Sequence, residues 1–155
     1  MPSSTFKVQS STGDRVPFHE SSDEAIAEAL REARVGAGDV FIDLGSGLGK
    51  VVRAAMATGA RARGIEIDPE LVRRARELGG DYICADACAA DLSDGTVFYL
   101  YVPFTGATLQ TVMDRLKEVR RPFRVCALSV DLEHAAPWLK RRPLESFWLA
   151  VYDAR

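Results

Sequence analysis

The sequence contains little of what would support a metal centre or a disulfide framework. Its 155 residues include three cysteines, Cys84, Cys88 and Cys126, and two histidines, His19 and His134. An odd number of cysteines without a C-x-x-C pair indicates neither disulfide bonds nor a zinc site. Two isolated histidines do not indicate a histidine-rich metal centre. We therefore expect no bound metal ion.

Long apolar runs and a strong excess of charge are also absent. No stretch approaches the roughly 20 apolar residues that a membrane-spanning helix needs, and the first ten residues lack the apolar centre of a signal peptide. Hydrophobic residues make up 47% of the chain, charged residues make up 27%, and the formal net charge is −2. This composition predicts one cytoplasmic domain, residues 1–155, without membrane contact. The slightly negative charge argues against a strongly basic protein that coats nucleic acid, though not against a local basic patch, and nucleic acid is not an expected partner.

Short apolar runs rich in β-branched residues alternate with helical patterns along most of the chain. This alternation predicts an α/β fold, Rossmann-like and doubly wound, with a mostly parallel sheet and helices on both faces. In such sheets the ligand binds at the carboxyl ends of the central strands. The strands are expected at 40–44, 62–67, 82–85, 96–102 and 124–130, and the helices between them at 50–58, 69–78 and 105–119.

The two ends of the chain depart from this alternation. The first helix is expected to begin at Ser21, because Ser21 and Glu24 have the S-x-x-E spacing of a capping box. The last strands are expected to be an antiparallel pair around Pro143. The expected parts are an N-terminal segment at 1–20 with a hairpin at 6–18, a core at 21–130, and closing strands at 131–155. In the closing part, a short helix is expected at 132–137 and extended segments at 138–140 and 147–152.

A glycine-rich turn follows the first strand of the core, with the sequence Asp43-Leu44-Gly45-Ser46-Gly47-Leu48-Gly49. Glycine lets the backbone adopt unusual conformations and approach a ligand closely. The helix that follows presents unpaired N–H groups and the positive end of its dipole. Glu66 ends the next strand, where its carboxylate can accept hydrogen bonds from two ribose hydroxyls. Together these features predict a ligand of the adenosine type.

Three kinds of nucleotide loop can be compared with this turn. A dinucleotide-binding loop has the pattern G-x-G-x-x-G, but here the third glycine comes one residue early. A P-loop needs Ser or Thr after its lysine, whereas Val51 follows Lys50. An adenosine with a cationic, amino-acid-bearing tail fits best. The reason is that Asp43 would repel a pyrophosphate and attract an ammonium or sulfonium group.

The turn and Gly64-Ile65-Glu66 resemble motifs I and II of the class I S-adenosylmethionine-dependent methyltransferases, over about residues 20–130. The D-x-G-S-G-x-G form is most similar to the Dot1 group and related small protein-lysine methyltransferases. The resemblance implies that S-adenosyl-L-methionine is the cofactor, S-adenosyl-L-homocysteine is its product, and a protein lysine is the favoured acceptor. A catalytically silent cofactor-binding module and a small-molecule methyltransferase remain alternatives, and the oligomeric state stays open.

The resemblance also implies roles for individual residues around the cofactor. Asp86 follows the third strand, where a solvated carboxylate or a loop cap is an equally good interpretation. The expected cofactor-binding residues are Asp43 near the methionine amine, Gly45, Ser46, Gly47 and Gly49 in the turn, Glu66 at the ribose, Ile67 against the adenine, Asp86 at its 6-amino group, and the backbone N–H of Ala87 at a ring nitrogen.

The end of the fourth strand occupies the position of motif IV, where related N-methyltransferases orient the acceptor amine. Here Tyr101-Val102-Pro103-Phe104 matches only the final Pro-aromatic half of the N/D-P-P-Y/F tetrad. Tyr101, Pro103 and Phe104 are therefore the expected acceptor-side catalytic residues. The alternative is that these side chains are the apolar end of a buried strand.

Several arginine-rich clusters remain, and runs of like charge are usually solvated surfaces. Two of them, Arg120-Arg121-Arg124 and Lys140-Arg141-Arg142, could approach the substrate side of the sheet. An acidic partner is therefore a possible but disfavoured interpretation of these two clusters.

Overall fold

The computed structural model describes residues 21–101, 104–146 and 148–155. The hairpin expected at 6–18 lies outside the described residues. None of the helices in the described parts of the chain is long and apolar enough to cross a membrane. The helices are α1 (Asp23–Glu32), α2 (Lys50–Met56), α3 (Pro69–Leu78) and α4 (Gly106–Lys117), and the strands are β1 (Val40–Leu44), β2 (Arg61–Glu66), β3 (Tyr82–Cys84), β4 (Val97–Tyr101), β5 (Phe123–Leu128), β6 (Lys140–Arg141) and β7 (Leu149–Ala154).

The strands form one sheet in the order β3-β2-β1-β4-β5-β7-β6. Neighbouring strands from β3 to β5 pair in parallel. Strand β7 is antiparallel to both β5 and β6. The predicted Rossmann-like α/β fold with a closing antiparallel pair is therefore confirmed. The strand order reverses between β1 and β4, and in open α/β sheets ligands bind at the carboxyl ends of the strands at such a point.

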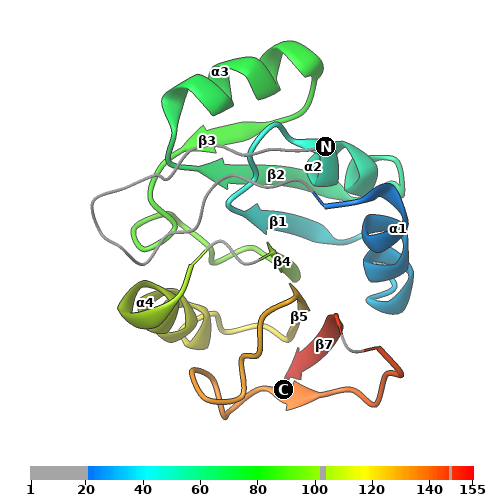
Figure 1. Ribbon diagram of the computed structural model, residues 1–155, viewed down its shortest axis with the longest axis vertical. Helices are drawn as coiled ribbons and strands as arrows, with labels where there is room; N and C mark the ends of the chain where they lie inside the picture. Colours follow the sequence, from blue (N-terminus) through cyan, green and yellow to red (C-terminus); the bar gives the residue numbers. More distant parts are fainter. Residues whose placement is uncertain (1–20, 102–103, 147) are drawn as a thin grey trace.

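Helices cover both faces of the sheet, with α1 and α4 on opposite sides (Figure 1). One apolar cluster joins Ile26 of α1 to Phe41 of β1. A second cluster joins Val112 of α4 to Ile42, the next residue of β1. Because successive side chains of a strand point to opposite faces, covering both faces requires the nearly continuous apolar run seen at 40–44.

The helix starts were predicted well at α3 and one residue too early at α1. Asp68 caps α3 by accepting hydrogen bonds from the backbone N–H groups of Glu70 and Leu71. The cap of α1 is Ser22, whose hydroxyl accepts from the N–H of Ala25, so the prediction of Ser21 was wrong. The hydroxyl of Ser21 instead forms a buried hydrogen bond of 2.9 Å with the hydroxyl of Tyr99 on β4.

The short helix expected at 132–137 was also wrong, because this segment forms turns. The backbone N–H of Leu132 donates to the hydroxyl of Tyr152 on β7. Leu132 and Ala136 are fully buried in the cluster on the α4 side of the sheet. The hydrogen bond to Tyr152 and the burial of these two side chains hold the segment, in which the N–H of Ala136 donates to the carbonyl of Leu132 in a single turn.

The two clusters Arg120-Arg121-Arg124 and Lys140-Arg141-Arg142 lie at the edge of the sheet formed by the amino ends of the parallel strands. Arg124 is level with Val97 at the start of β4. Lys140 is level with Asp153 near the end of the antiparallel β7, which reaches the same edge. The glycine turn follows the opposite, carboxyl end of β1, so the interpretation that these clusters could approach the substrate side is wrong.

Candidate functional site

The glycine turn after β1 rests on the carboxyl end of β2. The backbone N–H groups of Gly45 and Ser46 both donate to the carbonyl of Ile65, at 2.8 and 3.1 Å. Gly45, Gly47 and Gly49 have φ values of 88°, 57° and 87°, a region that other residues rarely adopt. The turn therefore needs glycine at these positions, as the sequence predicted.

Gly64 of β2 is required for a different reason, which is the close approach of Ser46. A Cβ atom at position 64 would overlap the side chain of Ser46 and lie 2.9 Å from Cδ1 of Tyr82. The hydroxyl of Ser46 is buried and has no hydrogen-bond partner among the described residues. Ser46 thus contributes a buried hydroxyl to the turn, and this hydroxyl has no hydrogen-bond partner among the described residues.

Glu66 at the end of β2 connects two loops. Its Oε1 atom accepts from the N–H of Gly47 at 2.9 Å, and its Oε2 atom accepts from the N–H of Asp68 at 3.1 Å. A carboxylate has about four acceptor positions, so this one can still accept from two ligand hydroxyls. Burial raises the pKa of Glu66, and the hydrogen bond from Gly47 is the main influence that lowers it.

Asp43 is a buried acid on β1, level with Gly64 on one side and with Tyr99 on the other. Only 3% of its surface is exposed. No described residue forms a hydrogen bond or an ion pair with its carboxylate. Burial, and secondarily the charge of Glu66, raises the pKa of Asp43 well above its usual range. Such a group is costly unless a ligand supplies a cation or a donor.

These groups fit an adenosine that carries a cationic amino-acid tail. Asp43 would face the ammonium group, Glu66 would hold the ribose hydroxyls, and the hydroxyl of Ser46 would gain a polar partner. Ile67 is 40% exposed directly after Glu66 and could pack on the adenine. When bound, S-adenosylmethionine supplies an electrophilic methyl group, and the protein supplies orientation and shelter from water.

Asp86 and Ala87 follow β3, where the sequence placed the adenine. The Oδ1 atom of Asp86 accepts from the N–H of Cys88 at 2.9 Å, and the carbonyl of Asp86 accepts from the N–H of Ala90. Asp86 therefore caps a turn, which was the structural alternative for this residue. Ala87 is 3% exposed and belongs to the cluster on the α4 side.

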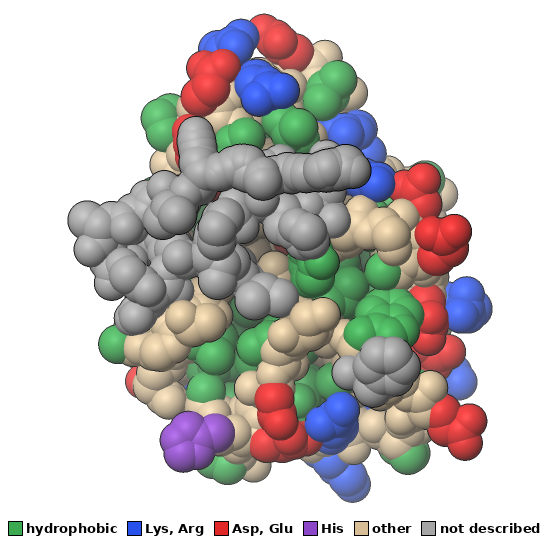
Figure 2. Space-filling view, in the orientation of Figure 1, with side chains coloured by type: hydrophobic (Ala, Val, Ile, Leu, Met, Phe, Trp, Pro, Cys, Tyr) green, Lys and Arg blue, Asp and Glu red, His purple; other side chains and the backbone are tan. Residues whose placement is uncertain are grey.

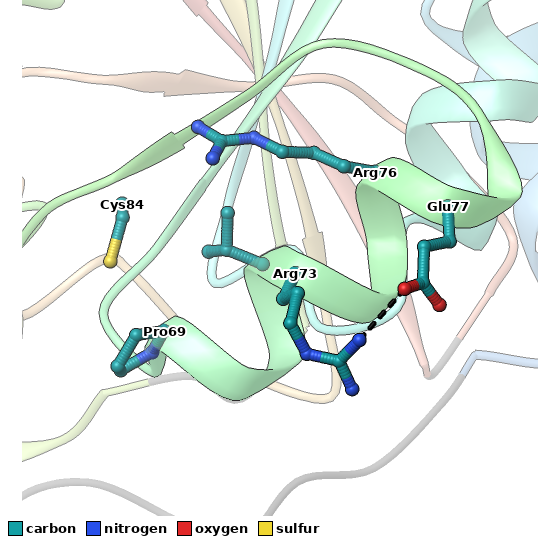
Figure 3. A pocket seen from close by; sticks show the side chains of 6 residues that line it. Pro69, Arg73, Arg76, Glu77 and Cys84 are labelled. Carbon is teal, nitrogen blue, oxygen red and sulfur yellow. Dashed lines mark hydrogen bonds and ion pairs between the residues drawn. The ribbon is translucent and has the colours of Figure 1, made fainter.

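A groove of about 410 Å³ lies between α3 and the end of β3 (Figure 3). Across it, Cys84 faces side chains of α3, where Arg73 and Glu77 form an ion pair of 2.7 Å. The groove is lined by Pro69, Val72, Arg73, Arg76, Glu77 and Cys84. Asp43 and Glu66 are not among these residues, although Cys84 is level with Glu66 on the neighbouring strand.

The two described residues that were predicted at the acceptor side, Tyr101 and Phe104, do not lie together. Tyr101 is half-buried and packs against the cluster on the α1 side. Phe104 is 2% exposed and packs in the cluster on the α4 side, as the buried-strand alternative implied. Pro103 lies outside the described residues. Of the described residues predicted at the acceptor side, Tyr101 is therefore the one that is partly exposed to solvent. Burial raises the pKa of its phenol.

Trp148 is a candidate that the sequence did not single out. The residue after it, Leu149, is level with Leu128 on β5, and Leu128 is level with Tyr101 on β4. The carbonyl of Trp148 accepts from the N–H of Ser129 at 2.7 Å. Its ring is half-buried against the same cluster as Tyr101. Only the insertion of β7 beside β5 brings it to this edge.

The two aromatic residues belong to an apolar part of the carboxyl edge. In Figure 2, hydrophobic side chains gather at the centre of the face in view, and lysine and arginine side chains lie mostly towards its outline. Half-buried apolar side chains at this edge include Tyr101, Leu144 and Trp148, all packed against the cluster on the α1 side. This surface can bind a flat or apolar group.

Comparison with known proteins agrees with these features. Residues 42–127 match the family described as "Methyltransferase domain". A solved RNA methyltransferase from Salinibacter ruber, in complex with S-adenosyl-L-homocysteine, is 33% identical, with a TM-score of 0.72, covering 88% of this chain and 92% of that chain. A precorrin-6y C5,15-methyltransferase from Geobacter metallireducens, 16% identical, shares the fold with a TM-score of 0.65 over 88% of this chain and 91% of that chain.

A second relative resembles part of this chain only. The small-subunit ribosomal RNA methyltransferase A of Anaeromyxobacter sp. (strain K) is 40% identical over 76 residues, which is 46% of this chain. The match spans 27% of the length of that relative. The family match covers more than half of the present chain, and its cofactor is the one that the sequence predicted. The chain therefore belongs to the methyltransferase-domain family of the class I S-adenosylmethionine-dependent methyltransferases.

Proposed function

We propose that this protein transfers a methyl group from S-adenosylmethionine to a nitrogen atom of an RNA base. The observation that carries the proposal is the similarity, over 88% of this chain, to a protein described as an RNA methyltransferase. The partial match to ribosomal RNA methyltransferases supports it. The resemblance of the glycine turn to protein-lysine methyltransferases keeps a lysine as the competing acceptor.

The chemistry at the end of β4 favours an acceptor that arrives uncharged. A lysine has a reference pKa of about 10.4, so its ammonium group must lose a proton before it can attack a methyl group. β4 ends in Tyr101, and because burial raises the pKa of this phenol, it stays protonated near pH 7 and does not act as a base. The amino group of a nucleobase is neutral at this pH, so it needs no deprotonation before it attacks, and the proton that it loses on methylation can pass to water.

The apolar surface at the same edge favours a flat acceptor. Unpaired bases stack on aromatic side chains, and such stacking contributes about 1–3 kcal/mol per base. Tyr101 and Trp148 provide two half-buried aromatic rings on one side of the sheet. In this proposal Asp43, Gly45, Ser46, Gly47, Gly49, Glu66, Ile67, Asp86 and Ala87 surround the cofactor, and Tyr101, Pro103, Phe104 and Trp148 form or support the acceptor side.

The test is a methyl-transfer assay on material from a strain that lacks the gene. The purified protein is incubated with radiolabelled S-adenosylmethionine and either total RNA, small ribosomal subunits or the protein fraction. We expect label that ribonuclease releases and protease does not, and much less label with a Glu66→Ala control at a low cofactor concentration. Label that protease releases would instead identify a protein acceptor, and label confined to small molecules would also contradict the proposal.

A further inference from the structure

A second surface of the protein carries unpaired positive charge. It lies at the amino ends of the parallel strands, opposite the glycine turn, and is called here the basic edge. Arg155 donates to the carbonyl of Val119 at 2.8 Å, which places it beside the loop that leads into β5. The basic edge consists of Arg34, Arg61, Lys117, Arg120, Arg121 and Arg155, all of which are exposed.

The other charges at this edge largely neutralise one another. Asp39 is paired with Arg124, and Asp153 is paired with Arg142 at 2.7 Å. Arg63 is paired with Asp94 at 2.8 Å. Within the described residues, none of the six cations of the basic edge forms an ion pair. Three exposed acids without an ion pair, Asp81, Asp91 and Glu118, lie at the same edge. A chain with a net charge of −2 thus concentrates positive charge here.

Helix dipoles account for only one cation of the basic edge, Lys117, which lies in the last turn of α4. α1 ends at this edge, and cations near the carboxyl end of a helix are stabilising. Two other arginines already serve that end of α1, since Arg124 donates to the carbonyl of Ala33 and Arg142 donates to that of Glu32 at 3.1 Å. The other five cations of the basic edge lie in the last turn of none of the described helices. Their clustering therefore calls for a partner of opposite charge.

The spacing of the cations suits an extended polyanion. Arg61 begins β2, and Arg121 precedes β5, which is separated from β2 by β1 and β4. With roughly 4.8 Å between neighbouring strands, these two cations span about 14 Å along the edge. A five-residue strand rises about 17 Å, so the basic edge lies about that far from the glycine turn.

We propose that the basic edge binds the phosphate backbone of the RNA substrate, at a distance from the atom that is methylated. This inference rests on the proposed function, and it assigns affinity and acceptor choice to opposite edges of the sheet. The carboxyl edge would recognise one base through Tyr101 and Trp148, and the basic edge would contact phosphates without reading the sequence. The substrate would then be a folded RNA large enough to reach both edges.

The salt dependence of RNA binding tests this proposal directly. We would measure the affinity of the full chain for a fluorescent RNA hairpin of roughly 16 base pairs at salt concentrations from about 50 to about 200 mM. Each phosphate contact contributes about 0.9 to the slope of log affinity against log salt. The Arg120→Gln/Arg121→Gln variant should therefore reduce the slope by about 2 and weaken binding.

The matched control is Arg73→Gln/Arg74→Gln on α3, which changes the net charge equally on another surface. It should leave the slope unchanged, and both variants should bind S-adenosylhomocysteine and unfold thermally as the parent protein does. An unchanged slope in the Arg120→Gln/Arg121→Gln variant would overturn the basic edge as an RNA surface, even if RNA is methylated. Binding to anionic lipid vesicles without binding to the hairpin would overturn it as well. Reduced slope together with label only in protein would retain the surface and contradict the proposed function.

Discussion

The backbone N–H of Gly47 donates to Oε1 of Glu66 over 2.9 Å, which ties the glycine turn after β1 to the carboxyl end of β2. The other carboxylate oxygen accepts from the N–H of Asp68, the residue that caps α3. One side chain therefore fixes the two loops between which a nucleoside would lie. Glu66 is expected both to organise these loops and to hold the ligand.

Replacing Glu66 should weaken cofactor binding without unfolding the protein. Glu66→Ala removes a charged acceptor of two ribose hydrogen bonds, so we expect a loss of roughly 2–3 kcal/mol in binding free energy. Glu66→Gln keeps an oxygen that can accept from Gly47 and should lose less. Calorimetry with S-adenosylhomocysteine measures the affinities, and thermal unfolding checks the fold. Unchanged affinity in Glu66→Ala would show that the ribose lies elsewhere.

Asp43 should make the stability of the ligand-free protein depend on pH. Because burial raises its pKa in the folded state, the folded chain binds this proton more tightly than the unfolded chain. The contribution of Asp43 to the free energy of unfolding is then complete below its unfolded pKa of about 3.9 and is lost as pH rises through the raised folded pKa. The side chain of Asp43→Asn cannot titrate. The free energy of unfolding of this variant should therefore exceed that of the parent protein by an amount that grows with pH.

The same group should give cofactor affinity the opposite trend. The ammonium group of the ligand favours ionised Asp43, so affinity for S-adenosylhomocysteine should rise with pH in the parent protein and stay flatter in Asp43→Asn. For the stability prediction, urea unfolding of both proteins is measured at several pH values. Asp94 and Asp153, whose pKa values are lowered by Arg63 and Arg142, affect both proteins alike, so the difference between the two stability profiles isolates Asp43. Equal pH profiles for the two proteins would contradict this role.

Local sequence patterns were sufficient to predict most of the sheet and the glycine turn. The run Val40–Leu44 is apolar on both faces because α1 and α4 cover opposite sides of β1. The glycines of the turn have positive φ values, a requirement that the sequence displays directly. Asp68 and Pro69 begin α3 through contacts within a few residues. The last two features depend on neighbours in the chain, and the apolar run shows directly that β1 is covered on both faces.

The wrong predictions concern segments whose structure is determined by a residue far away in the sequence. Ser21 and Ser22 both suit a helix cap, and the choice depends on Tyr99, to which Ser21 is hydrogen bonded. The segment at 132–137 has a helical pattern but is held as turns by Tyr152. Trp148 reaches the acceptor edge only because β7 pairs with β5. A single sequence does not contain these pairings in a form that local patterns reveal.

Phe104 should act mainly in stability. Its side chain is 2% exposed in the cluster on the α4 side, and removal of a buried phenylalanine side chain costs about 3–5 kcal/mol. Phe104→Ala should therefore lower the free energy of unfolding by this amount, and Phe104→Leu should lower it less. Urea unfolding provides the measurement. Full stability combined with lost methyl transfer would instead assign Phe104 to the acceptor site.

Gly64 should tolerate no side chain while Ser46 is present. A Cβ atom at position 64 would overlap Ser46, and overpacking of this kind costs about 1–3 kcal/mol. Gly64→Ala should lower both the melting temperature and the affinity for S-adenosylhomocysteine, and adding Ser46→Gly should restore part of the stability, so the two changes are not additive. Gly36→Ala is the control, since nothing lies within 4 Å of that Cβ position. Additive losses would show that Ser46 does not cause the conflict.

Tyr101 and Trp148 should separate acceptor binding from cofactor binding. Both rings are half-buried at the carboxyl edge, so Tyr101→Ala and Trp148→Ala should each weaken acceptor binding by about 1–3 kcal/mol through lost stacking. Tyr101→Phe and Trp148→Phe retain a ring and should retain most of the activity. The affinity for S-adenosylhomocysteine should stay unchanged in all four variants, because neither residue is expected to contact the cofactor.

The second tryptophan of the chain provides the control for this prediction. Trp138 packs against Phe123 on the α4 side, with a ring-centroid distance of 6.2 Å, so Trp138→Phe should leave methyl transfer unchanged. In that variant Trp148 is the remaining tryptophan, and acceptor RNA should quench its fluorescence if a base stacks on it. Transfer rates and cofactor affinities measured on the same preparations distinguish the two roles. If Tyr101→Ala and Trp148→Ala both keep full transfer activity and quenching is absent, these rings are packing residues, and the acceptor must enter at another part of the carboxyl edge.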